Sequence, residues 1–118
     1  MLDDAARAAS HLLTGHWAAG TKCDHLPAEI RPAMRAEGYA VQAHVTALSR
    51  APLFGWKIAA TSTAGQKHIN VDGPLAGRII AEKVVAPGAT GSLAGNAMRV
   101  AEVEFPFRFG ADLEPRGT

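Results

Sequence analysis

The sequence predicts an α+β fold in which two N-terminal helices are followed by β-strands. Apolar side chains recur at helical spacing over residues 2–17 and again over residues 33–49. After Pro52 the apolar side chains alternate with small or polar ones, a pattern typical of strands. The chain has 118 residues, of which 47% are hydrophobic and 19% charged, so we expect one folded unit.

The first helix is expected from Leu2 to Trp17. Its apolar stripe consists of Leu2, Ala5, Ala6, Ala9, Leu12, Leu13 and Trp17. Asp3 is expected to cap the first turn, and Gly20 stands where a residue in the left-handed conformation would end the helix. Residues 21–32 contain two prolines and are expected to form a connection.

The second helix is expected from Ala33 to Ser49. One side of it carries Met34, Val41, Val45 and Leu48. Gly38 lies inside this segment, where glycine costs about 1 kcal/mol relative to alanine. Pro52 prevents the helix from continuing.

Two strands are expected in the middle of the chain. In the first, Phe54 to Thr61, one face carries Phe54, Trp56, Ile58 and Ala60, and the other carries Lys57, Ala59 and Thr61. We expect Trp56 and Ile58 to pack into the core. The second strand is expected from Gly77 to Val85, after a turn at residues 72–74, and a loop is expected at residues 87–96.

The most regular alternation is in the last expected strand, Ala101 to Phe109. Its apolar face carries Ala101, Val103, Phe105, Phe107 and Phe109. Burial of each phenylalanine would contribute about 1.5 to 3 kcal/mol, so this face needs a partner layer. The other face carries Glu102 and Glu104.

Glu102 and Glu104 are candidate metal ligands. Residues two apart on a strand point the same way, with about 7 Å between their α-carbons, so the two carboxylates can converge on one ion. Carboxylate ligation suits a hard cation such as Mg²⁺ or Mn²⁺. The alternative is the solvated polar face of an amphipathic strand.

Lys57 is the candidate catalytic residue. It lies opposite the Trp56 face of its strand, next to small side chains. A lysine in a cleft or beside a metal ion can move protons or hold a carboxylate or enolate oxygen. The alternative is an ordinary surface lysine.

The sequence contains no motif typical of a histidine or cysteine metal site or of a phosphate-binding loop. The five histidines show no metal-ligand spacing, Cys23 is the only cysteine, and no phosphate-binding glycine loop occurs. Twelve basic and eleven acidic residues give a net charge of +1 without a basic run, so nucleic acid is not an expected partner. Without an export signal or a long apolar segment, we expect a soluble protein of the reducing cytoplasm, with no membrane contact.

Three segments together resemble a known family. They are Gly-Tyr-Ala-Val-Gln at 38–42, Gly-Trp-Lys-Ile-Ala-Ala-Thr-Ser at 55–62, and Ala-Glu-Val-Glu-Phe-Pro-Phe-Arg-Phe-Gly-Ala-Asp-Leu at 101–113. In this order they are similar to motifs of the 2-keto-4-pentenoate hydratase/2-oxohepta-3-ene-1,7-dioate hydratase family. Residues 66–77 also resemble the family's linking stretch.

The resemblance implies that residues 1–118 are a single partial domain, the N-terminal part of a fumarylacetoacetase-like mixed β fold. Three acidic residues hold a divalent cation in the family, and the first two match Glu102 and Glu104. The third would follow Thr118, in the family's β-rich region. Lys57 matches the active-site lysine, and Ser62 is a candidate substrate contact. Pro106 departs from the family pattern and indicates an edge or a bulge, and Ala59 replaces a common glycine.

The activity implied by the resemblance is that of a lyase of aromatic-compound catabolism, which hydrates 2-hydroxy-2,4-dienoates to 4-hydroxy-2-oxo acids with Mg²⁺ or Mn²⁺. A homo-oligomer is expected in the full-length family context. The rival activities are decarboxylation of a 4-oxalocrotonate-type diacid and C–C hydrolysis, and a further rival is a non-catalytic truncated remnant or assembly module. On its own, the 118-residue chain is expected to bind Mg²⁺ poorly and to lack activity.

Overall fold

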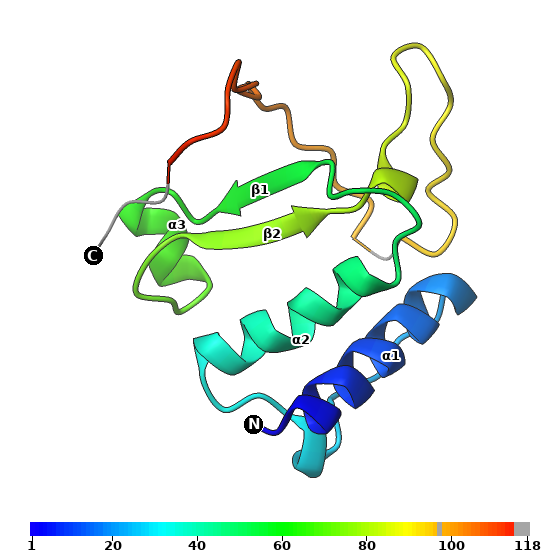
Figure 1. The fold of residues 1–118 in the computed structure, drawn as a ribbon, viewed down its shortest axis with the longest axis vertical. Helices are drawn as coiled ribbons and strands as arrows, with labels where there is room; N and C mark the ends of the chain where they lie inside the picture. Colours follow the sequence, from blue (N-terminus) through cyan, green and yellow to red (C-terminus); the bar gives the residue numbers. More distant parts are fainter. Residues whose placement is uncertain (97, 115–118) are drawn as a thin grey trace.

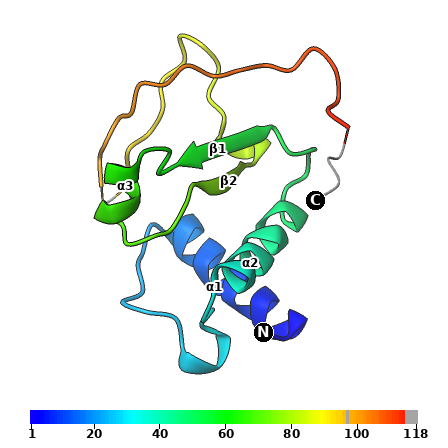
Figure 2. The same ribbon diagram turned by 90° about the vertical axis from the view of Figure 1, so that its left-hand side faces the viewer.

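The computed structural model describes residues 1–96 and 98–114 (Figures 1 and 2). A pair of helices lies beside a two-stranded antiparallel sheet, so the expected mixture of helices and strands is confirmed. The elements in chain order are α1 (Asp3–Ala19), η1 (Ala28–Ile30), α2 (Arg35–Ala47), β1 (Gly55–Ala59), α3 (Thr63–His68), β2 (Leu75–Ile79) and η2 (Ala81–Lys83). Within the described residues, no helix has the length and apolar character needed to cross a membrane.

Both N-terminal helices form close to where the sequence predicts them. Gly20 ends α1 in the left-handed conformation, with φ of 65°, as expected. The expectation for Asp3 is wrong, because Leu2 is the N-cap residue and no side chain caps the helix. Asp3 lies inside the first turn, and its carboxylate is 3.0 Å from Nε2 of His44 on α2.

The core is a small contact between α1 and α2. Its buried apolar residues are Ala6, Ala9, Val41 and Val45. Leu13, Leu26 and Ile30 pack against them from the side. The predicted stripe is therefore buried only at its centre, because Trp17 at the end of α1 is 59% exposed. Alanines allow the two helices to approach closely, but they bury little apolar area.

The sheet pairs β1 with β2 in antiparallel register, and Lys57 lies opposite Gly77. The second predicted strand extends too far, since β2 ends at Ile79 and the chain then turns into η2. Ile79 pairs with Gly55, where β1 begins, so the residues after Ile79 have no strand beside them. Between the strands, α3 occupies a segment in which no helix is predicted from the sequence.

Residues 101–109 are not part of a strand, which corrects the prediction for this segment. They form an extended arm that passes on the β1 side of the sheet, away from α1 and α2 (Figures 1 and 2). A strand needs a neighbour for its backbone hydrogen bonds, and within the described residues β1 and β2 pair only with each other. The expected burial of Trp56 and Ile58 is also wrong, because about half of each side chain is exposed.

Candidate functional site

Lys57 lies at the centre of β1, where alternation directs it away from the Trp56 and Ile58 side of the sheet. Gly77 is its cross-strand partner. A side chain at Gly77 would start 3.9 Å from the Cβ of Lys57, so the glycine leaves the space beside the lysine free. The ammonium group can therefore reach the segment that passes over this face.

The arm brings two carboxylates to this ammonium group. The Nζ atom of Lys57 lies 3.1 Å from Oε2 of Glu102 and also contacts Oε1 of Glu104. Both glutamates turn toward the sheet because alternate side chains of an extended segment share a side, even where no ladder forms. The sequence predicts that the two carboxylates share a side, but it predicts the wrong secondary structure for the arm and does not predict their contact with Lys57.

The ion pairs of Lys57 with the two glutamates contribute little to the stability of the fold. Lys57 is 36% exposed and the two glutamates are 66% and 50% exposed, so solvent screens their attraction. Ion pairs of this kind contribute about 0 to 1 kcal/mol. The cluster also carries two negative charges and one positive charge, which leaves it with an excess of one negative charge.

The two carboxylates fit a divalent cation as two of its ligands. Their oxygens already converge on a single positive charge, and carboxylate oxygen is the donor that Mg²⁺ and Mn²⁺ prefer. Over residues 1–96 and 98–114, no group of three or more His, Cys, Asp and Glu residues could hold a metal ion. A cation at Glu102 and Glu104 would therefore need water, substrate or a further group to complete its coordination.

Ser62, the candidate substrate contact, caps α3. Its hydroxyl accepts a hydrogen bond from the backbone N–H of Gly65 at 3.1 Å. The bond satisfies a donor at the helix N-terminus that would otherwise lack a partner. This role is structural and leaves the proposed contact with substrate without direct support.

Tyr39 and Gln42 have a structural role that the sequence analysis does not predict. The Gln42 amide donates to the carbonyl of Ala76 and accepts from the backbone N–H of Arg78, both at 3.1 Å. The Tyr39 hydroxyl accepts from the N–H of Ala76 at 3.1 Å. These side chains replace a third strand along the outer edge of β2. The Tyr-Ala-Val-Gln run thus joins α2 to the sheet, and only its i, i+3 spacing on a helix hints at this.

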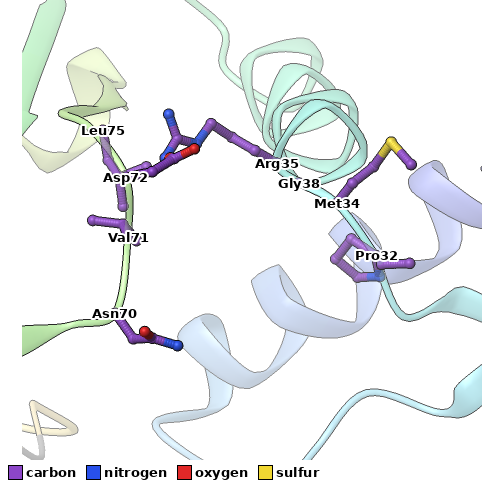
Figure 3. A pocket seen from close by; sticks show the side chains of 9 residues that line it. Pro32, Met34, Arg35, Gly38, Asn70, Val71, Asp72 and Leu75 are labelled. Carbon is purple, nitrogen blue, oxygen red and sulfur yellow. The ribbon is translucent and has the colours of Figure 1, made fainter. Parts of the chain in front are cut away.

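Two surface depressions lie elsewhere. One, of about 650 Å³, separates the start of α2 from residues 70–75, and the side chains of Arg35 and Asp72 form an ion pair across it (Figure 3). The other, of about 670 Å³, lies between the end of α1 and residues 92–96, with Met98 also lining it. Neither is lined by Lys57 or by the two glutamates, whose side chains are partly exposed to solvent.

We compared the chain with models of protein families, with curated proteins and with solved structures. No match was found in any of the three comparisons.

Proposed function

We propose that Lys57, Glu102 and Glu104 belong to a metal-dependent hydro-lyase that hydrates 2-hydroxy-2,4-dienoates of the 2-keto-4-pentenoate type. The observation that carries the proposal is the contact of the Lys57 ammonium with both carboxylates. These are the three residues that the family resemblance selects as catalytic and metal-binding. Two separate segments of the chain supply them, so their meeting does not follow from local sequence. The proposed fold context is the N-terminal part of a fumarylacetoacetase-like protein.

Each residue has a defined task in this proposal. Glu102 and Glu104 would hold Mg²⁺ or Mn²⁺, together with a third acidic ligand that follows residue 118 in the family. When bound, the cation supplies Lewis-acid stabilisation of enolate charge and orients the 2-oxo acid. Lys57 would carry the proton that adds to one carbon of the conjugated system while water supplies hydroxide to the other. The net reaction adds one water molecule, and transfer of the enol O–H proton to carbon gives the 4-hydroxy-2-oxo acid.

Decarboxylation of a diacid and C–C hydrolysis remain alternatives within the same site chemistry, because both also develop enolate charge beside a 2-oxo group. The products separate them. Hydration consumes the dienoate without releasing carbon dioxide, decarboxylation releases it, and C–C hydrolysis yields two shorter acids.

A non-catalytic assembly module is the second candidate, and a specific observation favours it. The side chains of Phe105 and Phe107 are 92% and 90% exposed, directly beside the carboxylates. A surface of this kind usually marks a contact with another protein. This candidate predicts that neither glutamate nor Lys57 affects any turnover.

The test is the loss of 2-hydroxypenta-2,4-dienoate absorbance in a protein that carries these residues together with the third acidic ligand. Lys57→Ala should lower kcat by about 10² to 10⁴ and change KM little, because a proton carrier acts in the transition state. Lys67→Ala, an exposed lysine on α3, is the matched control and should leave kcat unchanged. Equal turnover by the Lys57→Ala variant and the wild type would refute the proposed role.

A further inference from the structure

The arm presents its apolar side to solvent and its charged side to the body of the protein. Val103, Phe105 and Phe107 are 97%, 92% and 90% exposed, whereas the carboxylates on the alternate positions contact Lys57. This is the reverse of the usual arrangement, in which apolar side chains are covered and charged ones are solvated. The apolar side of the arm is therefore suited to a partner.

The backbone of the arm also lacks a neighbour. Within the described residues the only strand pairing joins β1 and β2, so no ladder engages residues 101–109. An extended, apolar and unpaired segment is a template for pairing with another chain. Pro106 limits how such pairing can occur, because proline has no N–H to donate.

The sequence of the arm is complementary to itself about Phe105. In an antiparallel pair of two copies centred there, Phe105 faces Phe105, Val103 faces Phe107, and Ala101 faces Phe109. On the alternate positions, Glu102 faces Arg108, which gives two pairs of opposite charge.

The same register accommodates Pro106. If the Phe105 pair exchanges both backbone hydrogen bonds, the next pair along the ladder, Glu104 with Pro106, exchanges none. The nitrogen of Pro106 then points to the open edge, where no donor is needed.

We propose that two copies of this chain associate through residues 101–109, paired antiparallel about a two-fold axis at Phe105. The contact is isologous, because each copy contributes the same nine residues. It extends the function of the arm beyond the Lys57 cluster and does not depend on any catalytic activity. The net charge of +1 means that two copies repel each other little.

The apolar area that the arm can bury limits the affinity of this dimer. At the exposures observed for Phe105, Phe107 and Phe109, the three phenylalanines offer roughly 500 Å². A standard interface buries about 800 Å² on each partner, so the arms alone form a small interface. The dimer should therefore dissociate on dilution.

Sedimentation velocity between about 1 and 200 µM covers the range in which small interfaces dissociate. The wild-type chain should shift from monomer to dimer with concentration. Phe105→Asp, which places two carboxylates opposite each other, should raise the dimer Kd at least about tenfold. Leu93→Asp, at another exposed apolar position outside the arm, should change it less than about twofold.

A charge exchange tests the pairing of Glu102 with Arg108. Glu102→Arg and Arg108→Glu should each weaken the dimer, and the double variant should form a tighter dimer than either single variant. It should not recover the wild-type Kd in full, because Glu102→Arg also removes the contact of this carboxylate with Lys57. Circular dichroism should show equal helix content in all variants, because the substituted side chains are exposed.

Disulfide formation tests the register. In a Cys23→Ser background, Phe105→Cys should form a cross-linked dimer on mild oxidation, since the two α-carbons would lie about 5.5 Å apart. Phe109→Cys should cross-link far more slowly, because the two cysteines would be roughly 27 Å apart. A chain that stays monomeric throughout the range, a dimer unaffected by Phe105→Asp, or equal cross-linking of the two cysteine variants would overturn the proposal.

Discussion

Ala60, directly after β1, has a left-handed backbone with φ of 55°. For a residue with a Cβ atom this conformation costs about 1–2 kcal/mol, a cost that glycine does not carry. The side chain of Gln66 donates to the Ala60 carbonyl at 3.0 Å, which helps to hold the turn. One site of backbone strain therefore lies between the strand that carries Lys57 and the helix that follows it, and Asn70 and Arg99 have the same left-handed conformation.

Ala60→Gly should raise the free energy of unfolding by about 0.5–1 kcal/mol, because it removes the left-handed penalty at a smaller entropic cost. Urea denaturation of the variant and the wild type measures the change. Ala59→Gly is the matched control. Its position is in the strand, so it should lower stability by about 0.5–1 kcal/mol. A loss of stability in Ala60→Gly would show that this backbone is not strained.

Sequence reasoning at the residue scale succeeds where a side chain's direction depends only on alternation. It predicts that Glu102 and Glu104 share a side and that Lys57 lies opposite Trp56. It fails for the burial of Trp56, because alternation divides a strand into two faces without saying which face a second layer covers. Ser62 could have been recognised as a helix cap, since serine is a favoured residue at that position.

Among the elements, Gln42 and Tyr39 join the helical pair to the sheet, and Gln42 makes two of their three hydrogen bonds. Gln42 on α2 satisfies both the carbonyl of Ala76 and the N–H of Arg78. Gln42→Met keeps the length of the side chain but leaves both backbone groups without this partner. It should destabilise the protein by about 1–3 kcal/mol, as measured by urea denaturation. A change near zero would mean that water replaces the amide at this edge.

Glu82 on η2 connects the sheet to the end of α2. Its carboxylate accepts hydrogen bonds from the backbone N–H of Arg50 at 2.7 Å and from the hydroxyl of Ser49 at 2.8 Å. The backbone bond from Arg50 is the largest cause that lowers the pKa of Glu82 below its ordinary value of 4.5. Because the folded-state pKa is depressed, the stabilisation is present above the ordinary pKa and is lost as pH falls through the folded-state value.

Glu82→Gln should therefore lower the Tm at pH 7, and the difference from the wild type should shrink below pH 4.5 and vanish at low pH. Thermal unfolding measured as a function of pH gives both curves. Glu29→Gln, an exposed carboxylate on η1, is the control and should leave the Tm unchanged. A Tm difference that stays constant with pH would contradict the role of the charged carboxylate.

Elements that depend on local signals were predicted best. The apolar spacing that predicts α1 and α2, and the residues that end them, lie within or next to each helix. The predicted bounds therefore agree with the observed ones to within about two residues. Six-residue α3 is too short for a period to be recognised. A strand depends on a neighbouring strand for its hydrogen bonds. For this reason β2 ends at Ile79, opposite the first residue of β1, and residues 101–109 are extended without a paired strand among the described residues.

For the whole molecule, the weakness of the core explains the open shape. The radius of gyration is 15.8 Å, whereas a compact chain of this length would have about 13.5 Å. The excess agrees with an arm whose backbone runs apart from β1 and β2 (Figure 2) and whose glutamates reach back to Lys57. The site at Lys57 depends on this arm, so site geometry and association of the arm are connected.

Mn²⁺ titration followed by NMR relaxation tests the proposed cation site at Glu102, Glu104 and the face of Lys57. Two carboxylates leave most coordination positions to water, so binding should be weak, with Kd on the order of 1 mM. Amide signals of residues 55–59 and 101–105 should broaden first. The Glu102→Gln, Glu104→Gln double variant should lose this effect, while Glu82→Gln retains it. Broadening centred on other carboxylates, and unchanged in the double variant, would contradict the account.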